Sequence, residues 1–251
     1  MYAITPEALF HIGSVPITNT LVNTIFVDTA LIGTAVYIKN HIKEIPSFFQ
    51  NIIEISIESM YNFVESVAGA NTTKIFPFVM SFFLFILVAN WSGLIPGIGA
   101  IGIFKHAEEG KKLIPLTKSA TSDLNVTFAL ALISLAATHV LSVRKLGIKE
   151  YLSRYISFNP INLFVGVLEI ISEFTKIVSL SFRLFGNIYA GEVVLTTIST
   201  IFAFVFPIPF LFLEIIVGFV QALVFSLLTM VFMSVLMTSH HQETHEEVKS
   251  R

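Results

Sequence analysis

The stretch Ile215–Thr238, IIVGFVQALVFSLLTMVFMSVLMT, runs for 24 residues without an acidic or basic side chain. An α-helix rises about 1.5 Å per residue, so this stretch would extend about 36 Å and cross the hydrocarbon core of a bilayer, which is about 30 Å thick. Three further uncharged stretches of 20 or more residues precede it, at Ile75–Phe104, Leu124–Val143 and Val193–Leu213. The sequence therefore predicts an all-α polytopic membrane protein.

The composition of the whole chain agrees with this fold class. Of its 251 residues, 54% are hydrophobic and 13% charged, with a mean hydropathy of +0.80, whereas soluble domains carry about 25% charged residues. A soluble enzyme is therefore excluded, and the net charge of −2 argues against a nucleic-acid partner. The absence of cysteine excludes disulfides and thiolate nucleophiles. We expect no metal, no cofactor, no direct nucleotide binding and no catalytic residues of its own.

The distribution of charges and prolines predicts about five membrane-inserted helices and one amphipathic helix in a single membrane domain. The last two helices are expected to form a hairpin, and because about 45 residues would reach roughly 67 Å, its first helix must be steeply tilted or broken. The expected bounds are 17–38, 75–95 and 124–143 for three spans, 46–70 for the amphipathic helix, 160–205 and 209–238 for the hairpin, and 239–251 for a polar tail.

The amphipathic segment carries an acidic stripe. Glu54, Glu58 and Glu65 fall on one helical face, and Met60 and Val64 lie largely opposite. Such a helix lies in the membrane surface, or it packs against a partner or the rest of the same protein. The sequence leaves these alternatives open.

Basic residues indicate the orientation in the membrane. Clusters follow the first and third spans, which places the N-terminus outside and the tail in the cytoplasm. The lysines of residues 105–118 would then lie on the outer side, against this trend.

Six ionisable residues lie within the predicted hairpin. A charge at the bilayer centre costs about 2.5–3.5 kcal/mol, so these side chains must face protein or water. They are Glu169, Glu173, Lys176, Arg183, Glu192 and Glu214.

The spacing of these residues suggests proton movement. Glu169, Lys176 and Arg183 recur every seven residues and form one polar stripe, whereas Glu192 points to the other side of the helix. Partly buried carboxylates can take up and release protons, while a guanidinium keeps its charge and blocks a continuous path. For Glu173 and Lys176, an ordinary helix-spaced ion pair is an equally good interpretation.

The run Ser179–Glu192, SLSFRLFGNIYAGE, resembles the signature of subunit a of the bacterial F-type rotary ATP synthase. The similarity extends over most of the chain, although the first 45 residues share only the general pattern. The other matching segments are Phe85–Asn90, Leu94–Pro96, Ser122–Thr127 with Asp123 and Asn125, Asn159–Asn162, and Gln221–Ala222.

The resemblance implies a non-catalytic stator subunit that offers two offset proton half-channels to a rotating c-ring. Arg183 matches the arginine that separates the half-channels, with Asn187 and Gln221 beside it; Glu192 and Glu214 match the outer half-channel and Glu169 the inner one. Glu173, Ser179, Asp123 and Asn125 are weaker candidates. The implied partners are c subunits with buried carboxylates, peripheral stalk b subunits and membrane lipid. The implied location is the bacterial cytoplasmic (inner) membrane.

Two alternatives remain open at this level. The family often has histidine at the position of Glu214, so two neighbouring glutamates here could share a proton, and either could carry it. A stand-alone proton-coupled secondary transporter would also place an arginine among acids. Many such carriers show an internal repeat, and none is visible in this sequence.

Overall fold

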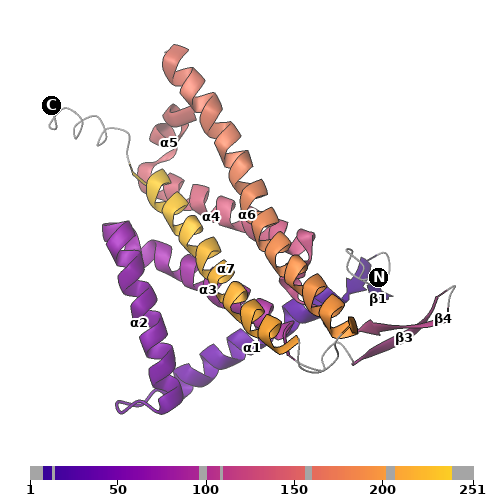
Figure 1. Cartoon of the computed structure of the whole chain (residues 1–251). Coiled ribbons are helices and arrows are strands. Elements are labelled where there is room, and N and C mark those ends of the chain that lie inside the picture. Colours follow the sequence, from indigo (N-terminus) through magenta and orange to yellow (C-terminus); the bar gives the residue numbers. More distant parts are fainter. Residues whose placement is uncertain are drawn as a thin grey trace.

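The computed structural model describes residues 8–12, 15–95, 101–107, 110–155, 160–201 and 207–238. These residues are mainly helical, which confirms the all-α polytopic class (Figure 1). The helices are α1 Asn19–His41, α2 Phe48–Ala68, α3 Thr72–Ser92, α4 Leu124–Leu146, α5 Ile148–Tyr155, α6 Pro160–Ile201 and α7 Pro207–Leu236, with the short 3-10 turns η1 Gly69–Asn71 and η3 Ala120–Ser122.

Two small antiparallel hairpins were not predicted from the sequence. The strands β1 Ala8–Ile12 and β2 Val15–Thr18 pair ahead of α1, and β3 Gly102–Ala107 pairs with β4 Gly110–Pro115 between α3 and α4. Both lie in segments expected to be irregular. The first hairpin moves the start of the first span from residue 17 to residue 19, because β2 occupies residues 17 and 18 and Thr18 then caps α1 by accepting a hydrogen bond from the Leu21 amide at 3.3 Å.

Four stretches within the described residues are long and apolar enough to cross a membrane. They are α1, the continuous stretch Phe48–Ser92 that contains α2 and α3, α4 and α7. The long helix α6 carries five charged side chains, and its insertion in the membrane stays a prediction. The tail 239–251, residues 202–205 at the expected end of α6, and Asn159 lie outside the described residues.

The core is formed where α7 packs on α3 and α6 packs on α4 and α7 (Figure 1). Aromatic side chains join α3 to α7: the ring centroids of Phe82 and Phe225 are 5.6 Å apart, and those of Phe83 and Phe219 are 5.9 Å apart. Leu184 and Ile188 of α6 are buried in the same cluster. Packing of this kind fixes α6 and α7 side by side, so the polar residues on both helices hold defined positions.

Helix α5 lies between the predicted span 124–143 and the predicted helix from residue 160, where the sequence predicted no helix. Arg154 in its last turn suits the helix dipole, whereas its first turn holds both Lys149 and Glu150, whose charges oppose each other. Its end lies against α6 at Gly166, where an added Cβ would overlap the Tyr155 carbonyl. Glycine at residue 166 therefore permits the close approach that brings α5 to the polar face of α6.

The proline pair at residues 207 and 209 also differs from expectation. The predicted bounds 160–205 and 209–238 leave residues 206–208 for the turn of the helical hairpin, but α7 already begins at Pro207. The first turn of a helix tolerates proline, because its amide nitrogens have no partner within the helix. Both prolines therefore lie in the first turn of α7.

The amphipathic helix α2 packs against α3 and α7. Met60 and Val64 are buried, as the stripe pattern predicts, whereas Phe49 and Val67 are 52% and 43% exposed. Packing on the same chain thus accounts for part of its apolar side. A further contact with the membrane surface or a partner stays a prediction.

Candidate functional site

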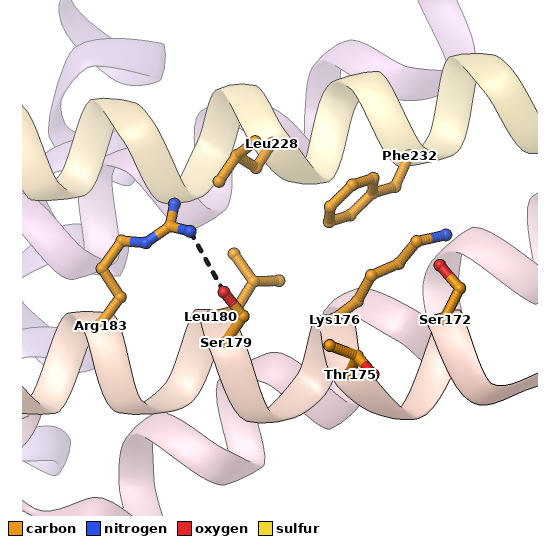
Figure 2. Close-up of a pocket in the computed structure, with 8 residues that line it drawn as sticks. All are labelled: Ser172, Thr175, Lys176, Ser179, Leu180, Arg183, Leu228 and Phe232. Carbon is orange, nitrogen blue, oxygen red and sulfur yellow. Dashed lines mark hydrogen bonds between the residues drawn. The ribbon is translucent and has the colours of Figure 1, made fainter.

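Arg183 lies near the middle of α6, on the side that faces α7 (Figure 2). Its Nη2 donates a hydrogen bond to Ser179 Oγ at 3.1 Å, and the side chain is exposed. It lines an open cavity of about 290 Å³ between the two helices. The other lining residues are Ser172, Thr175, Lys176, Ser179, Leu180, Leu228 and Phe232. A permanent cation therefore borders a space that water or a partner side chain can enter.

Asn187 and Gln221, predicted to lie beside Arg183, contact each other. Asn187 Nδ2 donates to Gln221 Oε1 at 2.8 Å, and Gln221 is buried. Asn187 lies one helical turn beyond Arg183 on α6, and Gln221 is on α7. The amide pair therefore sets the spacing of the two helices next to the guanidinium.

Glu192 lies further along α6 and forms an ion pair with a residue from a distant segment. Lys118 Nζ, from the segment after β4, is 3.7 Å from Glu192 Oε2, and the two side chains are 10% and 15% exposed. They border a second cavity, of about 140 Å³. It is also lined by Gly93, Leu94, Pro115, Thr117, Ser119, Leu195, Thr196 and Leu211.

Glu214 of α7 is buried next to this pair. It is 5% exposed, and its Oε1 has no hydrogen-bond partner among the described residues. A Cβ added to Gly191 would overlap its carboxylate, so Glu214 packs on the α6 backbone immediately before Glu192. The structure thus brings Glu192 and Glu214 together, the two acids that the family resemblance assigns to the same half-channel.

Glu169 lies toward the other end of α6 and is paired with α5. Arg154 Nε is 2.7 Å from Glu169 Oε1, with side chains 10% and 19% exposed. Arg154 Nη1 also donates to the Leu236 carbonyl, at 3.3 Å. This arginine therefore ties the beginning of α6 to the end of α7.

Glu173 joins α6 to α4. Its Oε1 accepts from Lys176 Nζ at 2.9 Å, the helix-spaced ion pair that was one interpretation of the sequence. Its Oε2 lies 3.8 Å from His139 Nε2, and His139 Nδ1 is 2.9 Å from the hydroxyl of Tyr151. A chain of polar groups thus runs from the wall of the Arg183 cavity, through α4, to α5.

Asp123 and Asn125 lie at the start of α4. Asp123 Oδ1 accepts from the Asn125 amide at 2.9 Å and from Asn125 Nδ2 at 3.1 Å. Its Oδ2 accepts from Thr20 Oγ1 of α1 at 2.9 Å. Asp123 therefore caps α4 and ties it to α1, and these contacts involve neither Arg183 nor the acids of the hairpin.

Three residues that contact the site were not predicted from the sequence: Lys118, Arg154 and Tyr151. All three come from segments expected to be loops, and the sequence separation from their partners hides the pairing. One signal was available for Lys118: Glu192 has no cation three or four residues away, so a buried carboxylate there needs a partner from another segment.

Comparisons with known proteins identify the family of this chain. The family model described as ATP synthase A chain matches residues 19–234. A relative, ATP synthase subunit a of Moorella thermoacetica (strain ATCC 39073 / JCM 9320), is 31% identical over 240 residues, which cover 96% of this chain and 100% of the relative. The chain therefore belongs to the ATP synthase A chain family.

Proposed function

We propose that this chain is the stator subunit a of an F-type ATP synthase. It provides two offset proton half-channels to a rotating c-ring and couples transmembrane proton flow to ATP synthesis or hydrolysis. The observation that carries the proposal is the placement of Arg183 in an open cavity between two separate groups of acids. Family membership supports the same role.

The two acid groups lie on opposite sides of Arg183 along α6. Glu169 is 14 residues before it and Glu192 nine residues after it, which corresponds to about 21 Å and about 13 Å along the helix axis. A proton that enters at Glu192 and Glu214 must pass the arginine to reach Glu169 and Glu173. A guanidinium does not release its proton in proteins. The proton therefore has to travel on another carrier, and a carboxylate on a rotating partner meets that need.

The surface beside Arg183 suits an apolar partner. Phe182, next to Arg183 on α6, is 55% exposed, and Ala190, two helical turns further along the same face, is also exposed, so an apolar helix can pack around the arginine while its own carboxylate reaches the guanidinium. We assign this face to the c-ring. The peripheral stalk b subunits and membrane lipid are assigned to the other exposed helices.

The proposed orientation follows the positive-inside rule, with the N-terminus outside and the tail in the cytoplasm of a bacterium, in its cytoplasmic membrane. Glu192 and Glu214 then belong to the outer half-channel, and Glu169 and Glu173 to the inner one. ATP chemistry belongs to other subunits of the complex.

ATP-driven proton pumping in inverted membrane vesicles tests the proposal. The Arg183→Ala chain should abolish pumping while the complex still assembles, as judged by the amounts of subunits in the membrane. Arg144→Ala is a matched control, because Arg144 is exposed at the end of α4, and it should pump like the wild type. Unchanged pumping by Arg183→Ala would favour a self-contained transporter instead.

A further inference from the structure

Lys118 is a charged residue at the outer acid pair to which the family motif and the proposed function give no role. It lies between β4 and η3, outside the membrane helices. Nevertheless its side chain is only 10% exposed, and it borders the same cavity as Glu192. Because burying an ammonium group is costly, its position requires a compensating interaction.

The backbone at Lys118 is held in place by two helices. Asn23 Nδ2 of α1 donates to the Lys118 carbonyl at 2.8 Å, and Ser119 Oγ donates to the Ala89 carbonyl of α3 at 3.1 Å. Gly93 lies against Ser119 so closely that an added Cβ would come within 2.7 Å of the Ser119 Cβ. The lysine side chain therefore starts from a fixed point.

The ammonium group reaches Glu192 from this point. Its Nζ lies 3.7 Å from Glu192 Oε2 and 5.8 Å from the centroid of the Tyr189 ring. Among the described residues, the titratable groups that face Glu192 are Lys118 and Glu214, with Tyr189 beside the ammonium. An opposite charge at this distance stabilises the carboxylate against the cost of burial.

Glu214 lacks this stabilisation. It is 5% exposed, and no ion pair to it is found among the described residues. Each of the two acids has one oxygen without a hydrogen-bond partner there, Oε1 of Glu214 and Oε2 of Glu192, so the ion pair with Lys118 is the difference between them. Although both acids are glutamates, Lys118 makes their surroundings unequal.

We propose that Lys118 is a positioning residue of the outer half-channel, whose ammonium stabilises the carboxylate form of Glu192 and so makes Glu192 the acceptor of the incoming proton. A hydronium ion in the cavity gives its proton to the Glu192 carboxylate and becomes water. Glu214 passes a proton toward the ring carboxylate and is refilled by Glu192, which returns to the carboxylate form. The assignment of this cavity to the outer half-channel rests on the proposed function.

ATP synthesis by inverted vesicles tests the role of the charge. The lumen of these vesicles corresponds to the outer side, so its pH can be varied while a potassium diffusion potential keeps the total driving force constant. In Lys118→Gln the lumenal pH that gives half the maximal rate should rise by about one unit, because a carboxylate without its cation is protonated at higher pH. Lys118→Arg keeps the charge and should retain the wild-type midpoint.

Two controls make the result specific. Lys74→Gln removes an exposed lysine at the start of α3 and should leave the profile unchanged. Lys118→Met is a second uncharged variant in case Lys118→Gln does not accumulate. The proposal is overturned if Lys118→Gln or Lys118→Met assembles and keeps the wild-type midpoint pH. It is also overturned if Lys118→Arg shifts the midpoint pH as much as Lys118→Gln does. If Lys118→Gln and Lys118→Met are both lost from the membrane while Lys118→Arg is present, the role of Lys118 is purely structural. That result also overturns the proposal.

A failure of the proposed function would look different. In that case Arg183→Ala vesicles would make ATP as the wild type does, whatever the Lys118 variants show. If Arg183→Ala abolishes ATP synthesis while the Lys118 variants and the wild type show the same dependence on lumenal pH, only the proposal for Lys118 is wrong.

Discussion

Asn187 Nδ2 donates a hydrogen bond to Gln221 Oε1 at 2.8 Å, and this contact joins α6 to α7 one turn away from Arg183. Each side chain comes from a different helix, and Gln221 is buried. A buried amide that loses its partner costs about 1–3 kcal/mol. The pair therefore holds the two helices at a spacing that leaves the cavity beside Arg183 open.

Replacing Gln221 by leucine should lower ATP-driven pumping by about tenfold. The change keeps the volume roughly constant but removes the hydrogen bond between the two helices, which contributes about 0.5–1.5 kcal/mol, and about 1.4 kcal/mol corresponds to a factor of ten in rate. Pumping is measured in inverted vesicles with equal amounts of the complex. Ser226→Ala is the matched control, because that buried hydroxyl donates only to the Ala222 carbonyl of its own helix among the described contacts. Equal pumping by both variants would contradict a role for the pair.

Adding a methyl group at Gly191 should displace the carboxylate of Glu214. An added Cβ there would overlap this carboxylate, whereas a Cβ at Gly33 of α1, an exposed residue away from Arg183, meets nothing within 4 Å. Gly191→Ala is therefore expected to reduce pumping at least several-fold, and Gly33→Ala to leave it near the wild-type rate. Both replacements favour the helix, so a loss confined to Gly191→Ala reports on the site. The reverse order of effects would show that the packing of Glu214 on α6 is unimportant.

Much of this fold follows from patterns that a sequence shows directly. Uncharged stretches of membrane length predict α3, α4 and α7, and the observed helices lie within a few residues of the expected bounds. The two β-hairpins and α5 were missed because each is short, and α5 also depends on tertiary contact. Helix α5 packs on α6 at Gly166, and no local sequence pattern predicts this contact.

The candidate site divides in the same way. Helical spacing put Arg183 in the polar stripe, and the family motif put Asn187 and Gln221 beside it; the structure brings the latter two into contact. Spacing could not identify Lys118 or Arg154, since each reaches its glutamate from a segment far away in the sequence. Such ion pairs depend on the tertiary path of the loops, and a single sequence does not indicate that path directly.

Arg154 and Glu169 should show strong energetic coupling. Their atoms Nε and Oε1 are 2.7 Å apart and both side chains are largely buried, so removing either one leaves an uncompensated charge at a cost of about 3–5 kcal/mol. We expect Arg154→Gln and Glu169→Gln each to lower the thermal stability of the purified complex, and the double variant to recover part of the loss. Thermal unfolding of the four proteins measures this cycle. Simple additivity of the two losses would mean that the contact contributes nothing.

Asp123 should matter for assembly more than for proton transfer. It caps α4 and accepts a hydrogen bond from Thr20 of α1, and the loss of a capping side chain alone costs about 0.5–2 kcal/mol. Asp123→Ala should therefore reduce the amount of folded chain in the membrane, whereas Asp123→Asn, which keeps an acceptor, should retain most of it. The test compares chain amount with pumping per assembled complex. Pumping per complex that falls to zero in Asp123→Asn would instead place the aspartate in the proton path.

The most direct test of the central claim is passive proton flow in inverted vesicles after removal of the soluble ATPase sector. If Arg183 separates two half-channels that a ring must bridge, wild-type flow should stop when the carboxylates of the ring are chemically blocked. With the same block, the assembled Arg183→Ala complex should still conduct protons between the two acid groups, because the cation between them is gone. Equal, negligible flow through both blocked complexes would contradict the account, since Arg183 would then not be the barrier between the two sides.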